Sequence, residues 1–247
     1  MRGLCAIFLA GCLAACASAA GTAPAASPGL PAASFWGEHG AGIADRLDGG
    51  AIYLTLDACG SKGDGYDSEL IEFLRAQAIP ATLFVNIRWI DQHPSEFARL
   101  AADPLFKIAS HGMRHLPAST TGRSAYGIAG AADPAALALE VRDAADRIEA
   151  ATGVRPTWYR SGTAFYDGRA VGLVTRDWGL KIAGYAIAAD EGSTLPAKRV
   201  EAKTLKAKPG DIILAHMNRP TGQTYEGLRP ALLALKARGA AFAKLPD

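Results

Sequence analysis

Two histidines, His111 and His115, carry the clearest sign of chemistry in this sequence. Three residues separate them, and in a helical turn this spacing places both imidazole rings on one side. Neutral imidazole is the commonest protein ligand for zinc and related metals, so the pair is a candidate metal-binding motif. The alternative is two solvated histidines at the start of a helix, because short motifs of this kind also arise by chance.

Further polar residues that could act in catalysis stand at the ends of short apolar runs. We expect the runs to form strands, and they cover residues 51–56, 81–87, 106–110, 157–160, 181–187, 211–216 and 239–245. The polar residues at or just after their ends are Asp57, His111, His115, Arg160, Asp190 and His216. A polar residue that closes a buried strand must find partners, so this placement indicates a shared site.

Segments with helical spacing of apolar residues separate these runs. They cover residues 67–78, 94–101, 133–152, 167–178, 197–206 and 225–238. Alternation of strands and helices predicts parallel strand pairing with right-handed crossovers. We therefore predict an α/β fold, a single domain built as a distorted (β/α)7 barrel, with a doubly wound open sheet as the alternative.

In both architectures, chemistry takes place at the carboxyl ends of the parallel strands. The six polar residues named above all fall at this end of the predicted sheet. Six such placements are hard to produce by chance, so the sequence predicts an enzyme site.

The composition fits a globular enzyme and argues against a nucleic-acid-binding protein. With 247 residues, 49% of them hydrophobic, the chain can bury the core of one domain. The 26 basic and 24 acidic residues give a net charge of +2 and form no basic cluster. The electrostatic pattern of a nucleic-acid-binding surface is therefore missing from the sequence.

The first 34 residues have the composition of an export signal and a linker. Arg2 precedes the apolar run Gly3–Ala15, which is too short to span a bilayer comfortably. The run ends in Leu13–Cys16, which resembles a bacterial lipoprotein box, where the chain is cut before the cysteine and the cysteine is acylated. We predict a lipoprotein-type signal peptide at 1–15, a flexible tether at 16–34 and the folded domain at 35–247. Plain secretion, with cleavage after Ala19, is the alternative.

The four cysteines fit this interpretation. Cys5 and Cys12 would leave with the signal peptide, and Cys16 would carry the lipid. Cys59 would then be a lone thiol, so no intramolecular disulfide is possible. The predicted location is the periplasm, with the membrane as a partner through the lipid anchor at Cys16.

From about residue 52 to residue 245, the sequence resembles the polysaccharide deacetylases of carbohydrate esterase family 4. The stretches that carry the resemblance are Thr55–Gly60, His111 to His115, Arg160, Asp190 and Leu214–His216. They are similar to the family's motifs Thr-Phe-Asp-Asp-Gly, His-x3-His, Arg-Pro-Pro-Tyr (met only at its arginine), the motif after the fifth strand, and Leu-x-His. The resemblance implies a distorted seven-stranded β/α barrel that removes acetyl groups from N-acetylated sugars with a bound divalent metal.

The resemblance also implies a role for each residue. The histidine pair would bind the metal, for which zinc is the first expectation. Asp57 would take a proton from the attacking water as general base, and Arg160 would hold it ionised. His216 would protonate the leaving amine, and Asp190 would favour the imidazolium that this step needs.

One departure from the family concerns the metal. The family's second aspartate, a metal ligand, is replaced by Ala58, which cannot bind a metal. Asp57, Cys59 or a water could fill the vacant position, or the metal could be lost. Asp57 and Cys59 are alternate residues, so in an extended strand they point to the same side. We expect Asp57 to be the third ligand, because the strand already directs it into the site.

The sequence therefore predicts a lipid-anchored deacetylase that acts on an N-acetylated polysaccharide, either peptidoglycan or an envelope polysaccharide. A metal-free barrel hydrolase that opens cyclic amides is one alternative, and the export signal and the histidine pair count against it. A catalytically inactive, glycan-binding lipoprotein is the other. Ala58 is the best support for that reading, whereas Asp57, Arg160 and His216 oppose it.

Overall fold

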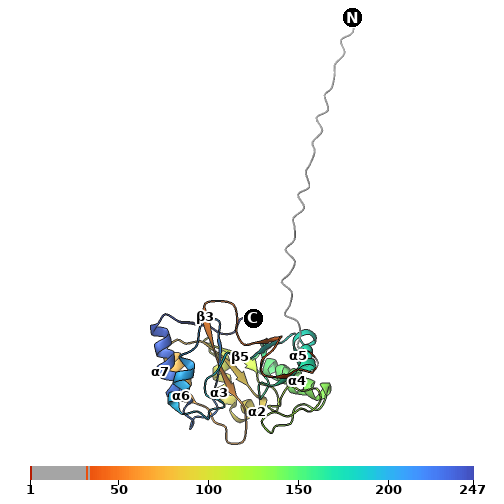
Figure 1. Ribbon diagram of the computed structural model, residues 1–247, viewed down its shortest axis with the longest axis horizontal. Coiled ribbons are helices and arrows are strands. Elements are labelled where there is room, and N and C mark those ends of the chain that lie inside the picture. Colours follow the sequence, from red (N-terminus) through yellow and green to blue (C-terminus); the bar gives the residue numbers. More distant parts are fainter. Residues whose placement is uncertain (2–31, 33) are drawn as a thin grey trace.

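The strands predicted from the apolar runs assemble into one curved parallel sheet with helices on its outside (Figure 1). The computed structural model describes Met1, Ala32 and residues 34–247. Apart from Met1, Ala32 and Ser34, the predicted signal peptide and tether, Cys16 included, lie outside the described residues.

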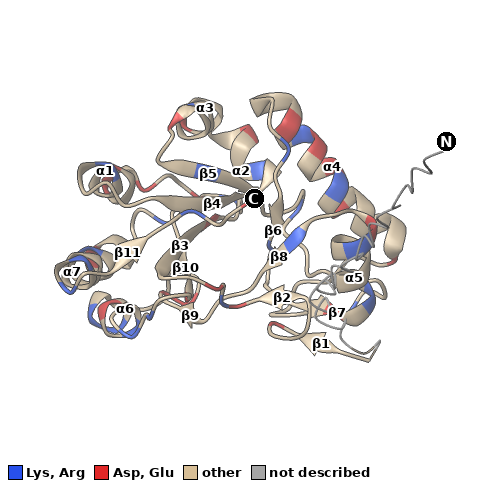
Figure 2. Cartoon of the chain, turned by 90° about the horizontal axis from the view of Figure 1, so that it is seen from above, with Lys and Arg blue, Asp and Glu red and all other residues tan. Residues whose placement is uncertain are grey.

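In the described part of the chain, nine strands form the sheet, and all neighbouring pairs are parallel. In spatial order they are β2 (Ile43–Ala44), β8 (Lys181–Ala183), β6 (Trp158–Tyr159), β5 (Phe106–Ser110), β4 (Ala81–Val85), β3 (Ala51–Ala58), β10 (Ile212–His216) and β9 (Ile187–Ala188), with β11 (Ala241–Phe242) beside β3. Figure 2 shows these strands in a ring with the helices around it. The predicted distorted barrel is confirmed.

The barrel is open because the run predicted as one strand at 181–187 is split. Its first half, β8, pairs with β6, and its second half, β9, pairs with β10. The break falls at Gly184, where an added Cβ would lie 2.1 Å from the Asp45 carboxylate, which accepts a hydrogen bond from the Tyr185 amide. The prediction of a continuous strand was wrong, because this contact turns the chain out of the ladder.

Helices cover the outside of the sheet between successive strands. They are α1 (Ser68–Ala76), α2 (Ile87–Gln92), α3 (Pro94–Ala102), α4 (Pro134–Thr152), α5 (Gly168–Gly172) with the π-helical turn η1 (Leu173–Asp177), α6 (Ala197–Thr204) and α7 (Thr224–Ala237). As predicted, Asp67 and Asp133 cap α1 and α4, accepting hydrogen bonds from the amides of Leu70 and Ala136. Helix α2 was not predicted: Asn86 ends the strand and caps this helix through the Arg88 amide.

Strand β3 is buried on both faces, as parallel strands are when helices cover the sheet. Leu54, Leu56 and Ala58 belong to the core under the helices. The alternate residues Tyr53, Thr55 and Asp57 point to the other face, so β3 directs Asp57 into the barrel.

The segment that carries the histidine pair is a loop and not the predicted helical turn. Gly112 and His115 both have left-handed backbone conformations, with φ of 78° and 66°. These conformations end any helix at once, and a non-glycine residue adopts them only when its surroundings impose them. The two histidines are therefore brought together by the path of the loop.

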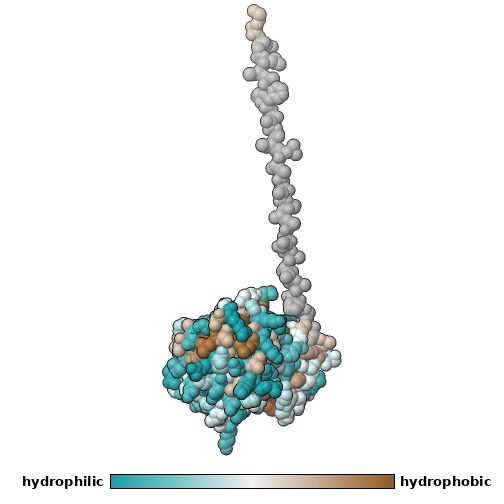
Figure 3. Space-filling model, turned by 60° about the vertical axis from the view of Figure 1, so that its left-hand side comes forward, coloured by the Kyte–Doolittle hydropathy of each residue, from teal (hydrophilic) through white to brown (hydrophobic). Residues whose placement is uncertain are grey.

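A short N-terminal segment closes one side of the molecule. Strand β1 (Trp36–Gly37) pairs in antiparallel fashion with β7 (Tyr166–Asp167), outside the main sheet. The face of the domain in Figure 3 is mostly hydrophilic with small hydrophobic areas. Within the residues that the structure describes, no helix has the length and apolar character needed to cross a membrane.

Candidate active site

A cavity of about 510 Å³ lies at the carboxyl ends of the strands. Asp57, Cys59, His115 and His216 line it, each from the end of a strand or from the loop that follows. The other predicted site residues, His111, Arg160 and Asp190, are buried against these four. The structure thus brings all six predicted catalytic and metal-binding residues into one place.

Arg160 is the buried cation of the site. Its guanidinium donates to the Asp57 carboxylate at 2.7 Å and to the Thr55 hydroxyl at 2.9 Å. It also donates to the carbonyls of Ala183 at 3.2 Å and Gly184 at 2.8 Å. Each of its three nitrogens therefore donates at least one hydrogen bond. An arginine so fully bonded holds its partner carboxylate in a fixed orientation.

Asp57 is ionised in this environment. Burial raises the pKa of its carboxyl, but the charges of Arg160, His111 and His216 outweigh burial and lower the pKa below its usual value. Its second oxygen, Oδ2, lies 3.6 Å from His111 Nε2. A carboxylate held ionised in a cavity can act as the general base for a water molecule that attacks a substrate.

His111 has a fixed tautomer. Its Nδ1 lies 2.9 Å from the carbonyl oxygen of Arg160, to which it donates, and this leaves Nε2 free to bind a metal. The Asn86 amide donates to the carbonyls of His111 and Gly112 at 2.9 and 2.8 Å. The imidazole is thus positioned from both sides by the backbone and by the cap of α2.

Among the described residues, one group of three side chains has donor atoms close enough to share a metal ion, and it consists of Cys59, His111 and His115. Their donor atoms all lie within 4.8 Å of one another, and Cys59 Sγ is 3.8 Å from His111 Nε2. For typical zinc–sulfur and zinc–nitrogen bonds, tetrahedral ligands are separated by about 3.6 Å. His115 Nε2 is buried without a hydrogen-bond partner in the described structure, as expected of an atom that binds a metal. The residues present therefore fit a divalent metal.

Cys59 is also electrostatically suited to bind a metal. Burial raises the pKa of its thiol, but contacts with His111, His115 and His216 outweigh burial and lower it well below the usual value. The expected third ligand, Asp57, is placed differently: one of its oxygens is bound by Arg160, and it is not part of the group of three donors. The geometry therefore favours Cys59, the alternative that the sequence left open, as third donor.

His216 and Asp190 form the second charged pair. The imidazole Nδ1 lies 2.8 Å from Asp190 Oδ1, and the His216 amide donates to Asp190 Oδ2 at 2.8 Å. Burial lowers the pKa of His216, but the Asp190 carboxylate outweighs it and raises the pKa well above its usual value. His216 is therefore protonated at neutral pH, with Nδ1 held by Asp190 and Nε2–H left to act as an acid.

Sequence reasoning missed three supporting residues. Thr224, the first residue of α7, donates its hydroxyl to Asp190 Oδ2 at 2.8 Å, and Thr55 accepts from Arg160. Glu140 of α4 accepts from the amides of Arg114 and Leu116 and fixes the loop between them. Glu140 could have been found, because a glutamate in the apolar stripe of a helix is buried and must have partners.

Residues 44–183 match the family described as Polysaccharide deacetylase. No curated protein matches the sequence. Three solved structures illustrate what the fold is similar to, and all share less than 25% of their residues with this chain, so they bear on the fold alone.

The Bc1960 peptidoglycan N-acetylglucosamine deacetylase has a TM-score of 0.68 at 17% identity, over 83% of this chain and 90% of that one. A family 4 carbohydrate esterase from Streptomyces lividans has a TM-score of 0.65 at 19% identity, over 80% and 93%. BA3943, a family 4 pseudoenzyme from Bacillus anthracis, has a TM-score of 0.64 at 19% identity, over 79% of this chain. The match covers 64% of that pseudoenzyme, so this chain spans less than two thirds of its length. Because the family match covers more than half of the sequence, the chain belongs to the polysaccharide deacetylase family.

Proposed function

We propose that the protein hydrolyses the N-acetyl amide of an N-acetylated glycan and releases acetate. The observation that carries this proposal is that Asp57, held by Arg160, and His216, held by Asp190, line one cavity beside three donors that fit a metal. An amide needs a base to activate the attacking water and an acid to protonate the leaving nitrogen. The cavity holds both.

Cys59, His111 and His115 would hold the divalent ion, which would polarise the acetyl carbonyl and lower the pKa of a bound water. One thiolate and two imidazoles favour zinc over manganese or magnesium, which prefer oxygen ligands. Three protein ligands leave a position for water or substrate, as in catalytic zinc sites.

Asp57 and His216 each carry out one of the two proton transfers. Asp57 accepts a proton from the attacking water while the water oxygen bonds to the acetyl carbon. Arg160 holds the Asp57 carboxylate in place. When the carbon–nitrogen bond breaks, His216 gives its Nε2 proton to the departing amine. Asp190 stabilises the imidazolium beforehand and holds the ring through Nδ1. The products are acetate and a free amino sugar.

The substrate class follows from the predicted export. A lipid at Cys16 and the tether at 16–34 would hold the domain at the periplasmic side of the envelope. Peptidoglycan and envelope polysaccharides are the N-acetylated glycans within its reach. One solved structure with the same fold is a peptidoglycan N-acetylglucosamine deacetylase, which supports this class.

A second candidate function is glycan binding without catalysis. Ala58, where the family has a metal-binding aspartate, and the pseudoenzyme BA3943, which shares the fold, favour it. Against it stands the side chain of Ala58, which is fully buried in the core under the helices. Cys59, one residue later, offers a third donor beside His111 and His115, so a metal could be held without an aspartate at position 58.

Metal content and acetate release, measured on the same sample, test the proposal. We expect purified protein to contain about one zinc ion per chain and to release acetate from chitooligosaccharides or peptidoglycan. Chelation should stop the release, and added zinc should restore it. Zinc without acetate release from either substrate would support the binding function, and acetate release without any metal would contradict the metal-dependent mechanism.

A further inference from the structure

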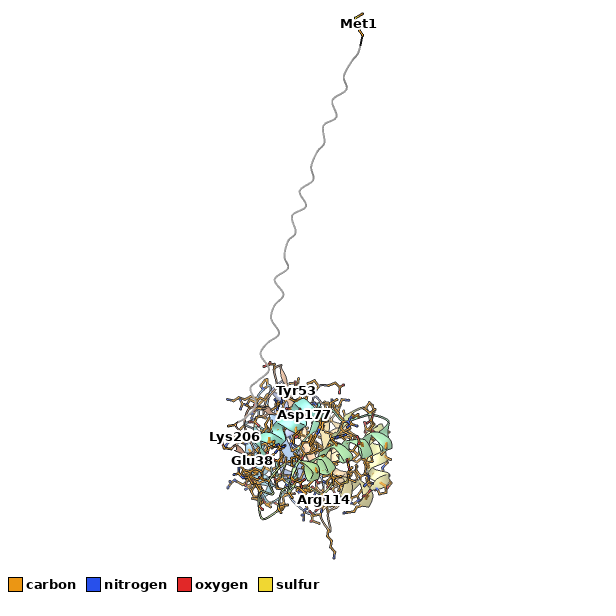
Figure 4. All side chains as sticks on the ribbon, turned by 90° about the vertical axis from the view of Figure 1, so that its right-hand side faces the viewer. Met1, Glu38, Tyr53, Arg114, Asp177 and Lys206 are labelled. Carbon is orange, nitrogen blue, oxygen red and sulfur yellow. The ribbon has the colours of Figure 1, made fainter. Side chains whose placement is uncertain are left out.

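Glu38, in the N-terminal segment, lines the same cavity as the catalytic residues. Its carboxylate accepts hydrogen bonds from two tyrosine hydroxyls, Tyr126 to Oε1 and Tyr185 to Oε2. In Figure 4, Glu38 lies between Tyr53, near the top of the domain, and Arg114, near the bottom. Two segments distant in the sequence thus hold this carboxylate in the cavity wall.

Glu38 differs from the other acidic residues of the cavity in its charge balance. Asp57 is paired with Arg160, and Glu191 is paired with Lys203. Glu38 has no lysine or arginine in ion-pair contact among the described residues. Its nearest basic group is His39 Nε2 at 4.0 Å, and that ring is closer to Asp45, at 3.0 Å. The cavity wall thus presents one negative charge without a strong cationic partner.

The two tyrosines hold the Glu38 carboxylate in place as hydrogen-bond donors. Hydrogen bonding to Glu38 raises the pKa of Tyr126 to about 12, and burial and Glu38 raise the pKa of Tyr185. Both hydroxyls therefore stay protonated donors at neutral pH. Each carboxylate oxygen can accept a further hydrogen bond, because it has a second lone pair. About 18% of the Glu38 side chain is exposed, which leaves room for a ligand group.

The surrounding aromatic groups hold this arrangement in place. Tyr126 is 75% exposed, and its ring packs edge-on against Phe165 at 5.5 Å; Phe165 packs against Trp36 at the same centroid distance. Trp36 lies in β1, whose pairing with β7 fixes the start of the segment that carries Glu38. Exposed aromatic faces attract cations, and a fixed carboxylate binds them more strongly than it binds neutral groups.

We propose that Glu38, Tyr126 and Tyr185 form a subsite for the protonated amino group of a de-N-acetylated sugar residue in the glycan. The inference rests on the proposed function, because the deacetylation of one residue creates the cation that this subsite binds. The protein then favours partly deacetylated chains over fully acetylated ones. An ammonium supplies the cationic partner that Glu38 lacks, whereas an acetamido group offers one neutral N–H.

Calorimetric titration with two tetrasaccharides tests the subsite, one of glucosamine and one of N-acetylglucosamine, at a pH where the amines are protonated. We expect the wild-type protein to bind the glucosamine tetramer, and Glu38→Gln to weaken that binding about tenfold or more. Binding of the N-acetylglucosamine tetramer should change much less. Glu69→Gln, on the exposed side of α1, is the matched control and should leave both affinities unchanged.

Two further measurements test the same contact between the subsite and the amine. Tyr126→Phe removes one hydroxyl from an exposed ring, so it should fold normally and weaken glucosamine binding by a smaller factor. Raising the salt concentration should weaken wild-type binding more than that of Glu38→Gln, because the contact is electrostatic.

Equal affinity of the wild type and Glu38→Gln for the glucosamine tetramer would contradict the proposed subsite. The absence of any binding of this tetramer to the wild type would also contradict it. Acetate release is measured separately and needs no cation subsite. Release with unchanged Glu38→Gln binding would therefore refute the subsite alone. Glu38-dependent binding without any release would refute the proposed hydrolysis.

Discussion

At the scale of single residues, Arg160 joins catalysis to folding. Its guanidinium bonds to two residues of β3 and to the carbonyls at and just after the end of β8, and it stacks over Phe84 at 4.3 Å. The residue is fully buried, so its charge depends on Asp57 for compensation. Removal of one member of a buried ion pair leaves the other uncompensated in a low-dielectric interior.

Asp57→Asn should therefore affect both activity and stability. Loss of the base should lower acetate release by about 10²–10⁴-fold. Because Arg160 loses its counter-charge, the free energy of unfolding should also fall, by about 3–5 kcal/mol. Asp48→Asn, an exposed residue before β3, is the control and should change neither quantity. Denaturant unfolding of Asp57→Asn that matches the wild type would show that Asp57 does not compensate Arg160.

The pH profile should depend on Asp190. The raised pKa of His216 keeps the acid protonated through neutral pH. The stability that the raised His216 pKa contributes is complete below about pH 6.5, the ordinary histidine pKa, and is lost as pH rises through the raised value. Asp190→Asn removes the charge that raises the pKa, so the alkaline limb of kcat/KM should move to lower pH. An alkaline limb that stays in place in this variant would assign the acid role to another group.

Metal affinity should depend on Cys59 and not on position 58. Cys59→Ser should lose bound zinc as fully as His111→Ala, and the cobalt-substituted wild type should show a thiolate-to-metal charge-transfer band that Cys59→Ser lacks. Ala58→Asp should not strengthen metal binding, because that side chain faces the core, and it should destabilise the fold by burying a charge. Zinc content of Cys59→Ser equal to that of the wild type would return the ligand role to Asp57.

At the scale of elements, the sequence predicted the strands and helices that show strong periodicity. Both Asp67 and Asp133 start their helices where capping chemistry indicated. The failures have tertiary causes. The strand at 181–187 breaks because Gly184 packs against Asp45, which is distant in the sequence. The strand expected to reach Ile87 stops two residues early, because Asn86 caps a helix and also holds the histidine loop.

The site was predictable to the extent that strand ends determine it. The positions of Asp57, Arg160 and His216 can be predicted from the alternation of side chains along a strand. They also fit the rule that catalytic groups gather at the carboxyl ends of parallel strands. The choice between Asp57 and Cys59 as metal ligand does not follow, because both share one side of the extended chain. The three-dimensional distances favour Cys59, because its donor atom lies within 4.8 Å of both histidine donors, and Asp57 does not belong to that group.

The loop of His115 should be sensitive to a single methyl group. A Cβ at Gly162 would lie 2.4 Å from the backbone carbonyl of His115, so Gly162→Ala must displace that histidine. We expect zinc affinity to fall by about 10–100-fold although all three donors remain. Gly50→Ala is the matched control, since nothing lies within 4 Å of its added Cβ. Equal zinc affinities of the two variants would show that the loop adapts without cost to the metal site.

At the scale of the whole molecule, the prediction that concerns anchoring depends on the first 16 residues. If Cys16 carries a lipid, the wild type should fractionate with membranes. Cys16→Ser should then appear in the soluble periplasmic fraction. Cys12→Ser, which changes a cysteine that would leave with the signal peptide, should stay with the membranes. Membrane association of Cys16→Ser would indicate another mode of attachment.

The buried pair of Arg160 and Asp57 also determines how this architecture can evolve. A descendant under no selection for hydrolysis still loses stability when either residue is exchanged alone, because such an exchange leaves a buried charge. Cys59 and His115 border the cavity, and their exchange carries no such penalty. In a survey of related sequences, the presence of the aspartate–arginine pair therefore indicates that the fold is retained. The presence of Cys59 and His115 as well indicates selection for hydrolysis.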